Sequence, residues 1–149
     1  MADTVDPATR SKMMAGIKGR DTRPELIVRS ALHRAGFRFL LHDRRLPGRP
    51  DIVLPKWRAV IQVQGCFWHR HEGCRFATTP RSNSKFWLAK LEQNVLRDRR
   101  DLDALGMLGW RIAVVWECGL KSSRTQSTIE DLEKWVAGNS RCYETKPTR

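Results

Sequence analysis

Long apolar runs are missing from this 149-residue sequence, which limits the classes of protein to which it can belong. No run approaches the roughly 20 apolar residues of a transmembrane helix. The first residues lack the apolar core of a secretion signal. Internal repeats and domain linkers are also missing, and this length suits one domain. We therefore expect a single domain in the bacterial cytoplasm.

Cysteine is scarce, and its placement argues against disulfides. Of the four cysteines, Cys66 and Cys74 lie in one short segment with two histidines. In a chain without a secretion signal, such clustering favours metal binding in a reducing compartment. Cys142 lies in a polar tail, and we expect it to play no part in the metal site.

Negative charge is in short supply. The chain has 28 Lys and Arg against 16 Asp and Glu, a net charge of +12, and a pI near 10.4. Residues 1–50 and 51–100 each carry +6, whereas residues 101–149 are neutral. Such an excess is typical of proteins that bind polyanions. The sequence therefore predicts a nucleic-acid-binding surface built by the first hundred residues, which associates this protein with the nucleoid.

A ten-residue segment, 65–74, holds two thiols and two imidazoles. Sulfur and imidazole nitrogen at this spacing suit Zn²⁺, and a closed four-ligand site is structural. A fourth ligand can arrive from the thiol that directly follows an apolar strand. The predicted ligands are Cys66, His71, Cys74 and Cys118. His69 is an equally plausible ligand by spacing, and the sequence leaves this choice open.

Two large aromatics, Phe67 and Trp68, lie inside the same segment. A loop held rigid by metal could insert them between stacked bases. Trp87 follows on a predicted helix, where its spacing from Leu91 also suits a core position.

Hydrophobic periodicity and turn residues predict the order α-β-β-β-α-β-α. A short basic helix is expected over residues 6–18, on an N-terminal DNA-binding arm of residues 1–20. A capping box, Thr22-x-x-Glu25, opens the next helix, with Leu26, Ile27, Leu32 and Ala35 inward. The remaining predicted strands are 37–41, 52–54, 58–64 and 111–116. The remaining predicted helices are a long one, which begins at Ser82 or Ser84 and ends at Leu108, and a last one over residues 127–137. We place Trp87, Leu91, Val95, Leu102 and Leu105 on the inward face of the long helix.

This order makes residues 21–137 a single α/β nuclease domain around a mixed sheet, followed by a polar, mobile tail at 138–149. It is similar to the core of restriction-endonuclease-like nucleases, in which a carboxylate sits where two central strands diverge. Asp51 is the best candidate for that carboxylate, because it follows a rigid Pro-Gly-Arg-Pro turn at the start of a strand. Mg²⁺ prefers one or two carboxylates with waters and phosphate oxygens.

The motifs together resemble the very-short-patch-repair (Vsr) mismatch endonucleases over residues 8–137. The matching segments are 46–51 (Leu-Pro-Gly-Arg-Pro-Asp), 65–71 with Cys74, 86–87, 94–95, 97–100, 109–111, 115–118 and, near the start, 8–12, Met14 and 20–22. The resemblance implies a Mg²⁺-dependent enzyme that nicks one strand of duplex DNA 5′ to the thymine of a T:G mismatch. It also implies repair of deaminated 5-methylcytosine and a mismatch-repair protein as partner. We expect a monomer, because one asymmetric lesion needs one active centre.

The resemblance also implies roles for individual residues. Asp51 and the Val63 carbonyl would bind magnesium, and His69 would act on the attacking water with support from Glu25 and Asp98. The zinc ligands would be Cys66, His71, Cys74 and Cys118, which resolves the choice of histidine. The DNA-binding residues would be Phe67, Trp68 and Trp87 from the major groove and Lys12, Met14 and Arg20 on the arm, with Met14 entering the minor groove.

One active-site position departs from the family pattern. Family members usually carry a second histidine just before the Gly-Cys-Phe-Trp run, where this chain has Gln64. A glutamine can orient water or phosphate but cannot exchange protons near neutral pH. Two other functions therefore stay open: a zinc-stapled protein that binds distorted DNA without cutting, and a nuclease of the same fold with another DNA substrate.

Overall fold

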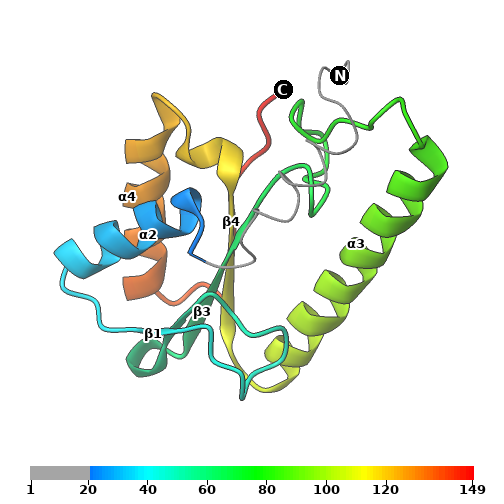
Figure 1. The fold of residues 1–149 in the computed structure, drawn as a ribbon. Coiled ribbons are helices and arrows are strands. Elements are labelled where there is room, and N and C mark those ends of the chain that lie inside the picture. The colour runs from blue at the N-terminus through cyan, green and yellow to red at the C-terminus, as the bar shows by residue number, and fades with distance from the viewer. Residues whose placement is uncertain (1–20) are drawn as a thin grey trace.

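The computed structural model describes residues 21–149, which form a five-stranded mixed sheet with helices on both faces (Figure 1). In spatial order the strands are β1 (Leu40–Leu41), β2 (Ile52–Leu54), β3 (Ala59–Gln64), β4 (Arg111–Trp116) and β5 (Cys142–Glu144). The pairs β1–β2 and β2–β3 are antiparallel, whereas the pairs β3–β4 and β4–β5 are parallel. The predicted mixed α/β architecture is confirmed, with β5 as an additional strand.

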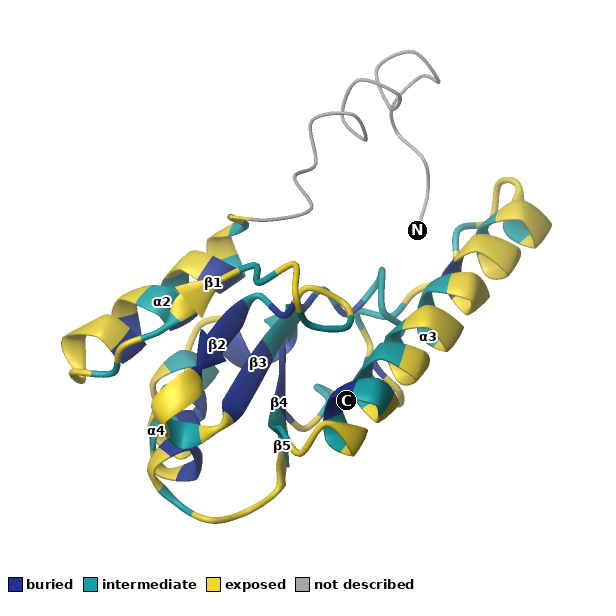
Figure 2. Cartoon of the chain, turned by 90° about the horizontal axis from the view of Figure 1, so that it is seen from below, coloured by how far each residue is buried: buried dark blue, intermediate teal, exposed yellow. Residues whose placement is uncertain are grey.

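Within residues 21–149, three α-helices pack on this sheet. They are α2 (Arg23–Arg34), α3 (Ser84–Met107) and α4 (Arg124–Ala137). Helices α2 and α4 cover one face and α3 lies on the other (Figures 1 and 2). A parallel pair of strands needs a long crossover, and α3 makes this connection between β3 and β4.

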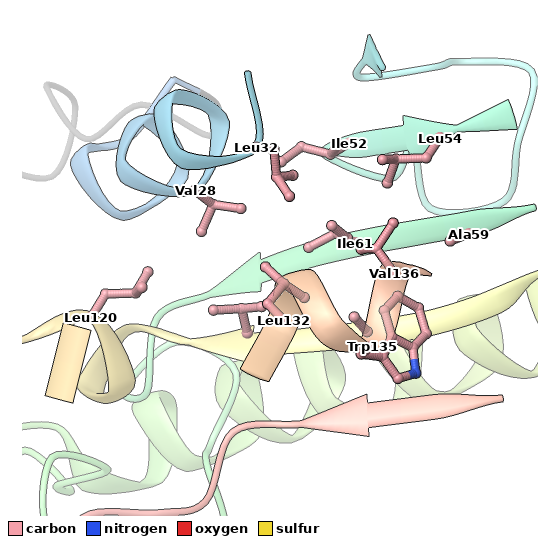
Figure 3. Close-up of a cluster of buried hydrophobic side chains, with 12 residues drawn as sticks. Val28, Leu32, Ile52, Leu54, Ala59, Ile61, Leu120, Leu132, Trp135 and Val136 are labelled. Carbon is pink, nitrogen blue, oxygen red and sulfur yellow. The ribbon is translucent and has the colours of Figure 1, made fainter. Parts of the chain in front are cut away.

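The main core lies between the sheet and helices α2 and α4 (Figure 3). Val28 and Leu32 from α2 meet Ile61 from β3 and Leu132 from α4, and all four are fully buried. Burying a side chain of this size stabilises the fold by about 1.5–3 kcal/mol. Apolar burial on this face therefore stabilises β2 and β3, and Val53 and Val60 are buried with Leu105 of α3 in a separate cluster.

The buried stripe of α2 differs from the predicted one. Leu26 is 47% exposed and Ala35 is also exposed, whereas Val28, Ala31 and Leu32 are buried. Glu25 is on the buried face too. The prediction is right for Leu32, which is buried, and for Ile27, which packs against the core. It is wrong for Leu26 and Ala35, because the buried Glu25 takes one position of the stripe.

Helix α3 is longer than the sheet it covers. Its 24 residues span about 36 Å, whereas a six-residue strand spans about 20 Å. Only Leu91 and Leu105 are buried on α3, and the other predicted inward residues are half-buried: Trp87, Val95 and Leu102. Part of the helix therefore overhangs the sheet and presents a largely exposed surface (Figure 2).

The polar tail expected at 138–149 is ordered, which corrects the prediction of a mobile segment. Residues 142–144 form β5 and pair in parallel with β4, and Thr145 is 3% exposed. The prediction was wrong because it equated polarity with mobility. Here the polar groups make hydrogen bonds, among them one from the Trp116 indole N–H to Glu144 (2.8 Å).

Other predictions have mixed outcomes. Strand 37–41 shortens to β1, since Phe37 still takes part in the end of α2, where its N–H donates to Leu32 O (3.0 Å). Residues 1–20, with Lys12, Met14 and Arg20, lie outside the described residues. Within residues 21–149, every helix is too short or too polar to cross a membrane.

Candidate functional site

Asp51 lies immediately before β2, beside the end of β3. Because these strands are antiparallel, with Ile52 opposite Ile61, the start of one meets the end of the other. The Val63 N–H donates a hydrogen bond to Asp51 Oδ2 (2.8 Å). The preceding turn needs a glycine at 48: its φ is +72°, and a Cβ there would approach Asp101 Cβ to 2.8 Å. The turn can therefore pack tightly against α3 and hold Asp51 in place.

A cavity of about 750 Å³ opens at this edge of the sheet. Asp51, Gln64, His69 and Asp98 line it, as do the arginines Arg44, Arg49 and Arg97. The structure thus brings four of the predicted catalytic residues to one cavity, together with cations that suit a phosphate. Val63, the other predicted magnesium-binding residue, also lines it.

The Asp51 carboxyl lies in an electrostatically unfavourable position. Burial is the main cause that raises its pKa, to about 8, and the neighbouring Glu25 carboxylate raises it further. The Val63 N–H and the Arg29 guanidinium oppose this rise. Two carboxylates held together in a buried place can both ionise only when a cation compensates their charge.

Only one of the two hydrogen bonds of the predicted capping box is made by Glu25, through its backbone N–H. Its N–H donates to the Thr22 hydroxyl at the start of α2 (3.4 Å). Its own side chain is buried and turns toward Arg29, which donates to it, and toward His42, whose Nε2 lies 3.0 Å from Glu25 Oε2. Arg29 also donates to Asp21. Asp21, Glu25 and His42 could share a metal, but the Arg29 guanidinium already pairs with both carboxylates.

His69 and Asp98 form a carboxylate–imidazole pair across the cavity. His69 Nδ1 lies 2.5 Å from Asp98 Oδ2, so this nitrogen donates to the carboxylate. In a neutral ring the other nitrogen, Nε2, is then a hydrogen-bond acceptor. This arrangement suits a group that orients or deprotonates water. Gln64 is 7% exposed on the same cavity.

The predicted zinc ligands converge on one point. The ligand atoms of Cys66, His71, Cys74 and Cys118 all lie within 4.8 Å of one another, and all four residues are buried. His71 Nδ1 is 3.6 Å from the Cys66 sulfur and 3.5 Å from the Cys118 sulfur. Sulfur and nitrogen bound to one tetrahedral Zn²⁺ lie about 3.6 Å apart. The cluster therefore has a geometry in which it could bind a metal ion.

The surroundings of His71 favour this histidine over His69 as the potential metal ligand. Its Nε2 lies 3.1 Å from the Thr145 carbonyl and donates to it, which leaves Nδ1 free of a proton and facing the thiols. The His71 ring also stacks on Trp116, with 4.2 Å between ring centroids and 4° between planes. Burial lowers the pKa of His71 and raises that of the Cys66 thiol.

We call Cys66, His71, Cys74 and Cys118 the thiol cluster. Residues after β5 contact its surroundings, and the sequence did not predict these contacts. The Arg124 guanidinium donates to the Lys146 carbonyl (2.8 Å) and the Thr148 hydroxyl (2.6 Å) and approaches the Cys118 sulfur (3.5 Å). The Arg75 N–H donates to the Thr148 carbonyl (2.8 Å). Cys142 is exposed and lies outside the cluster. The supporting residues escaped prediction because they act mainly through backbone carbonyls, which carry no sequence signal.

Phe67, Trp68 and Trp87 pack against one another, and we call them the aromatic cluster. Their ring centroids are 5.1, 5.9 and 6.0 Å apart. All three are partly exposed, and the Trp68 carbonyl accepts a hydrogen bond from the Asn94 side chain (3.3 Å). In the sequence, Phe67 and Trp68 stand between Cys66 of the thiol cluster and His69 of the cavity, so the loop that carries them joins the two sites.

The family model of the DNA mismatch endonuclease Vsr matches residues 2–75. The chain is 45% identical to the DNA mismatch endonuclease Vsr of Escherichia coli over 141 residues, 93% of this chain and 90% of the relative. The chain belongs to the Vsr DNA mismatch endonuclease family.

Other relatives of this Vsr-family chain are nicking enzymes. It is 49% identical to the Type II nicking enzyme V.XorIIP of Xanthomonas oryzae pv. oryzae, over 80% of this chain and 88% of the relative. It is 41% identical to V.NmeAIP of Neisseria meningitidis, over 82% and 86%. The predicted family and the predicted class of enzyme, a DNA mismatch nicking endonuclease, are confirmed.

Proposed function

We propose that this protein nicks one strand of duplex DNA 5′ to the thymine of a T:G mismatch, with Mg²⁺ as the catalytic cation. The observation that carries the proposal is the cavity lined by Asp51 and the His69–Asp98 pair, with Glu25 next to Asp51. Arg44, Arg49 and Arg97 supply positive charge for the phosphate backbone. The substrate is a lesion of the chromosome, so we place its site of action in the bacterial cytoplasm.

The residues at Asp51 fit a magnesium ion. Glu25 stands next to the carboxylate of Asp51 and raises its pKa, so a divalent cation would relieve their repulsion. Oxygen ligands are those that Mg²⁺ prefers, and we assign them to Asp51 and the Val63 carbonyl. Bound Mg²⁺ would activate water and neutralise charge on the phosphate.

The chain's own groups would then handle the proton and the substrate. His69, held at Nδ1 by Asp98, presents Nε2 as the acceptor for a proton of the attacking water. The arginines hold the phosphate in line with that water. Gln64 offers an amide that can orient water or phosphate without taking a proton. Together these roles assign phosphodiester hydrolysis to the edge of the sheet where β2 begins and β3 ends.

We assign Zn²⁺ to the cluster of Cys66, His71, Cys74 and Cys118, because its donor atoms and spacings fit a closed tetrahedral site. Its role is structural: it fixes the loop that carries Phe67 and Trp68. The helix and strand order also supports a restriction-endonuclease-like core, with Asp51 as its carboxylate. We assign residues 1–20 to a DNA-binding arm with Lys12, Met14 and Arg20, and we propose a monomer as the active form.

The decisive experiment compares duplexes that differ at one base pair. A T:G duplex and its C:G counterpart, with each strand end-labelled in turn, are incubated with excess protein and either Mg²⁺ or EDTA. We expect one cut, in the thymine strand, on the 5′ side of the thymine and only with Mg²⁺. Binding without a cut would support a non-cleaving recognition protein, and equal cutting of the C:G duplex would indicate another substrate.

Loss of the aromatic cluster should remove mismatch preference. Inserting aromatics costs a few kcal/mol of unstacking per base step, and a wobble pair should cost less to part than a matched one. In Phe67→Ala with Trp68→Ala, we expect the T:G and C:G nicking rates to converge, with the melting temperature nearly unchanged. Met107→Ala, at an 88% exposed apolar residue at the end of α3, is the control. A double variant that still prefers T:G would contradict insertion by this cluster.

A further inference from the structure

The cavity contains a second carboxylate–imidazole pair for which the proposed mechanism has no role. His42 lines the cavity, and its side chain is 18% exposed. Its Nε2 lies 3.1 and 3.0 Å from the two carboxylate oxygens of Glu25. The same nitrogen lies 3.9 Å from Asp51 Oδ1. The cavity lined by Asp51 therefore has two imidazoles, His42 and His69, each hydrogen-bonded to a carboxylate.

The backbone at His42 is held in an unusual conformation. Its φ is +48°, in the left-handed region that residues other than glycine seldom adopt. Its N–H donates to the Asp51 carbonyl (3.1 Å). His42 thus contacts the Asp51 backbone through its amide and the Glu25 carboxylate through its ring. Strained backbone of this kind persists where surrounding contacts over-determine it, often at functional sites.

We propose that His42 is a positioning residue, which locks the Glu25 carboxylate beside Asp51 and thereby sets the affinity of this pair for a divalent cation. This inference rests on the proposed function of Asp51. Both Glu25 oxygens lie within hydrogen-bond reach of Nε2, so that nitrogen carries a proton and donates it. Arg29 also donates to Glu25, and the same guanidinium nitrogen lies 3.5 Å from His42 Nε2.

Removing the His42 ring leaves Arg29 as the remaining described donor to the Glu25 carboxylate. Glu25 could then turn toward the guanidinium and away from Asp51, and the buried Asp51 would lose a neighbour that shares its cation. Supporting residues of this kind alter metal affinity by about 10–100-fold. Chemistry at the phosphate would otherwise be intact, since Asp51, His69 and Asp98 remain in place.

The test uses His42→Leu, which removes the donor, and His42→Gln, whose amide reaches a similar position and can donate to Glu25. His33→Leu, at an exposed position on α2, is the matched control. Binding is followed with Ca²⁺ by calorimetry and with Tb³⁺ by luminescence, and the site at Asp51 is defined as the binding lost in Asp51→Asn. Nicking of the T:G duplex is measured over a range of Mg²⁺ concentrations.

We expect His42→Leu to weaken Ca²⁺ binding at the Asp51 site by about 10–100-fold and to raise the half-saturating Mg²⁺ concentration by a similar factor. The rate at saturating Mg²⁺ should fall much less, and His42→Gln should recover most of the affinity. Equal cation affinity in wild type and His42→Leu would overturn the proposal, as would a failure of His42→Gln to improve on leucine. Should the wild type bind Ca²⁺ but never nick, the proposed function fails while the binding comparison still decides the role of His42.

Discussion

Asp51→Asn is expected to abolish nicking and, at the same time, to raise the melting temperature of the metal-free protein. The loss of nicking follows from the loss of the cation ligand, since a catalytic metal contributes several kcal/mol at the transition state, or about 10³-fold in rate. Asparagine keeps an oxygen that can accept the Val63 N–H, so the turn before β2 should be preserved.

The gain in stability has its own pH dependence. Burial keeps the Asp51 carboxyl protonated to about pH 8, whereas an aspartate in the unfolded chain ionises near pH 3.9. Between these pH values the native state binds the extra proton, so the free energy of unfolding falls as the pH rises. Asparagine has no such proton. We expect the variant to melt on the order of 5 °C above wild type at pH 8.5, and much closer to it near pH 4.

Thermal melts with and without Mg²⁺ provide the check. Mg²⁺ should raise the melting temperature of the wild type, because it binds the native state, and should leave that of Asp51→Asn nearly unchanged. Asp103→Asn, at an exposed position on α3, should change neither melting nor nicking. A variant that melts below wild type at pH 8.5 would show that Asp51 stabilises the fold, contrary to the burial argument.

Cys118→Ser should release the bound metal and lower stability more than any other single change considered. Structural Zn²⁺ contributes about 10–16 kcal/mol to folding in zinc-finger peptides, comparable with the whole stability of a typical domain. Cys118 also lies in a buried group with Trp116 and Val114 of β4. Loss of the metal should therefore loosen the end of the central strand as well as the loop.

Metal content by elemental analysis and melting by circular dichroism measure this effect. Cys142→Ser is the matched control, because this cysteine is exposed and outside the cluster. We expect about one zinc per chain in wild type and in Cys142→Ser, and a melting temperature lowered by tens of degrees in Cys118→Ser. Retention of zinc with unchanged melting would contradict the assignment of Cys118 as a ligand.

Several features could be predicted because local chemistry determines them. Strands β2 and β4 are apolar runs bounded by turn residues, and they form where the pattern places them. The thiol cluster was predicted from residue type and spacing, which leave few alternatives for soft ligands. Asp51 was identified because the rigid turn before it can place one carboxylate at the edge of a sheet.

Other features depend on contacts between distant segments. His42 stands in a polar stretch, and its ring reaches the cavity because the backbone at that residue adopts a positive φ. Spacing alone assigned Glu25 to a cap, and only the family resemblance gave it an active-site role beside Asp51. The choice between His69 and His71 depends on partners far along the chain, Asp98 and Thr145. Spacing within one segment carries no information about such partners.

The dependence of the thiol cluster on Thr145, Lys146 and Thr148 has a consequence for biosynthesis. Domains fold largely as units while the chain leaves the ribosome, and residues 66–74 emerge long before residues 145–148. The cysteine-rich loop must therefore wait, with its thiols exposed, until the last segment has emerged and closed around it. During that interval the thiols of the nascent chain are accessible to oxidants and to thiophilic metal ions.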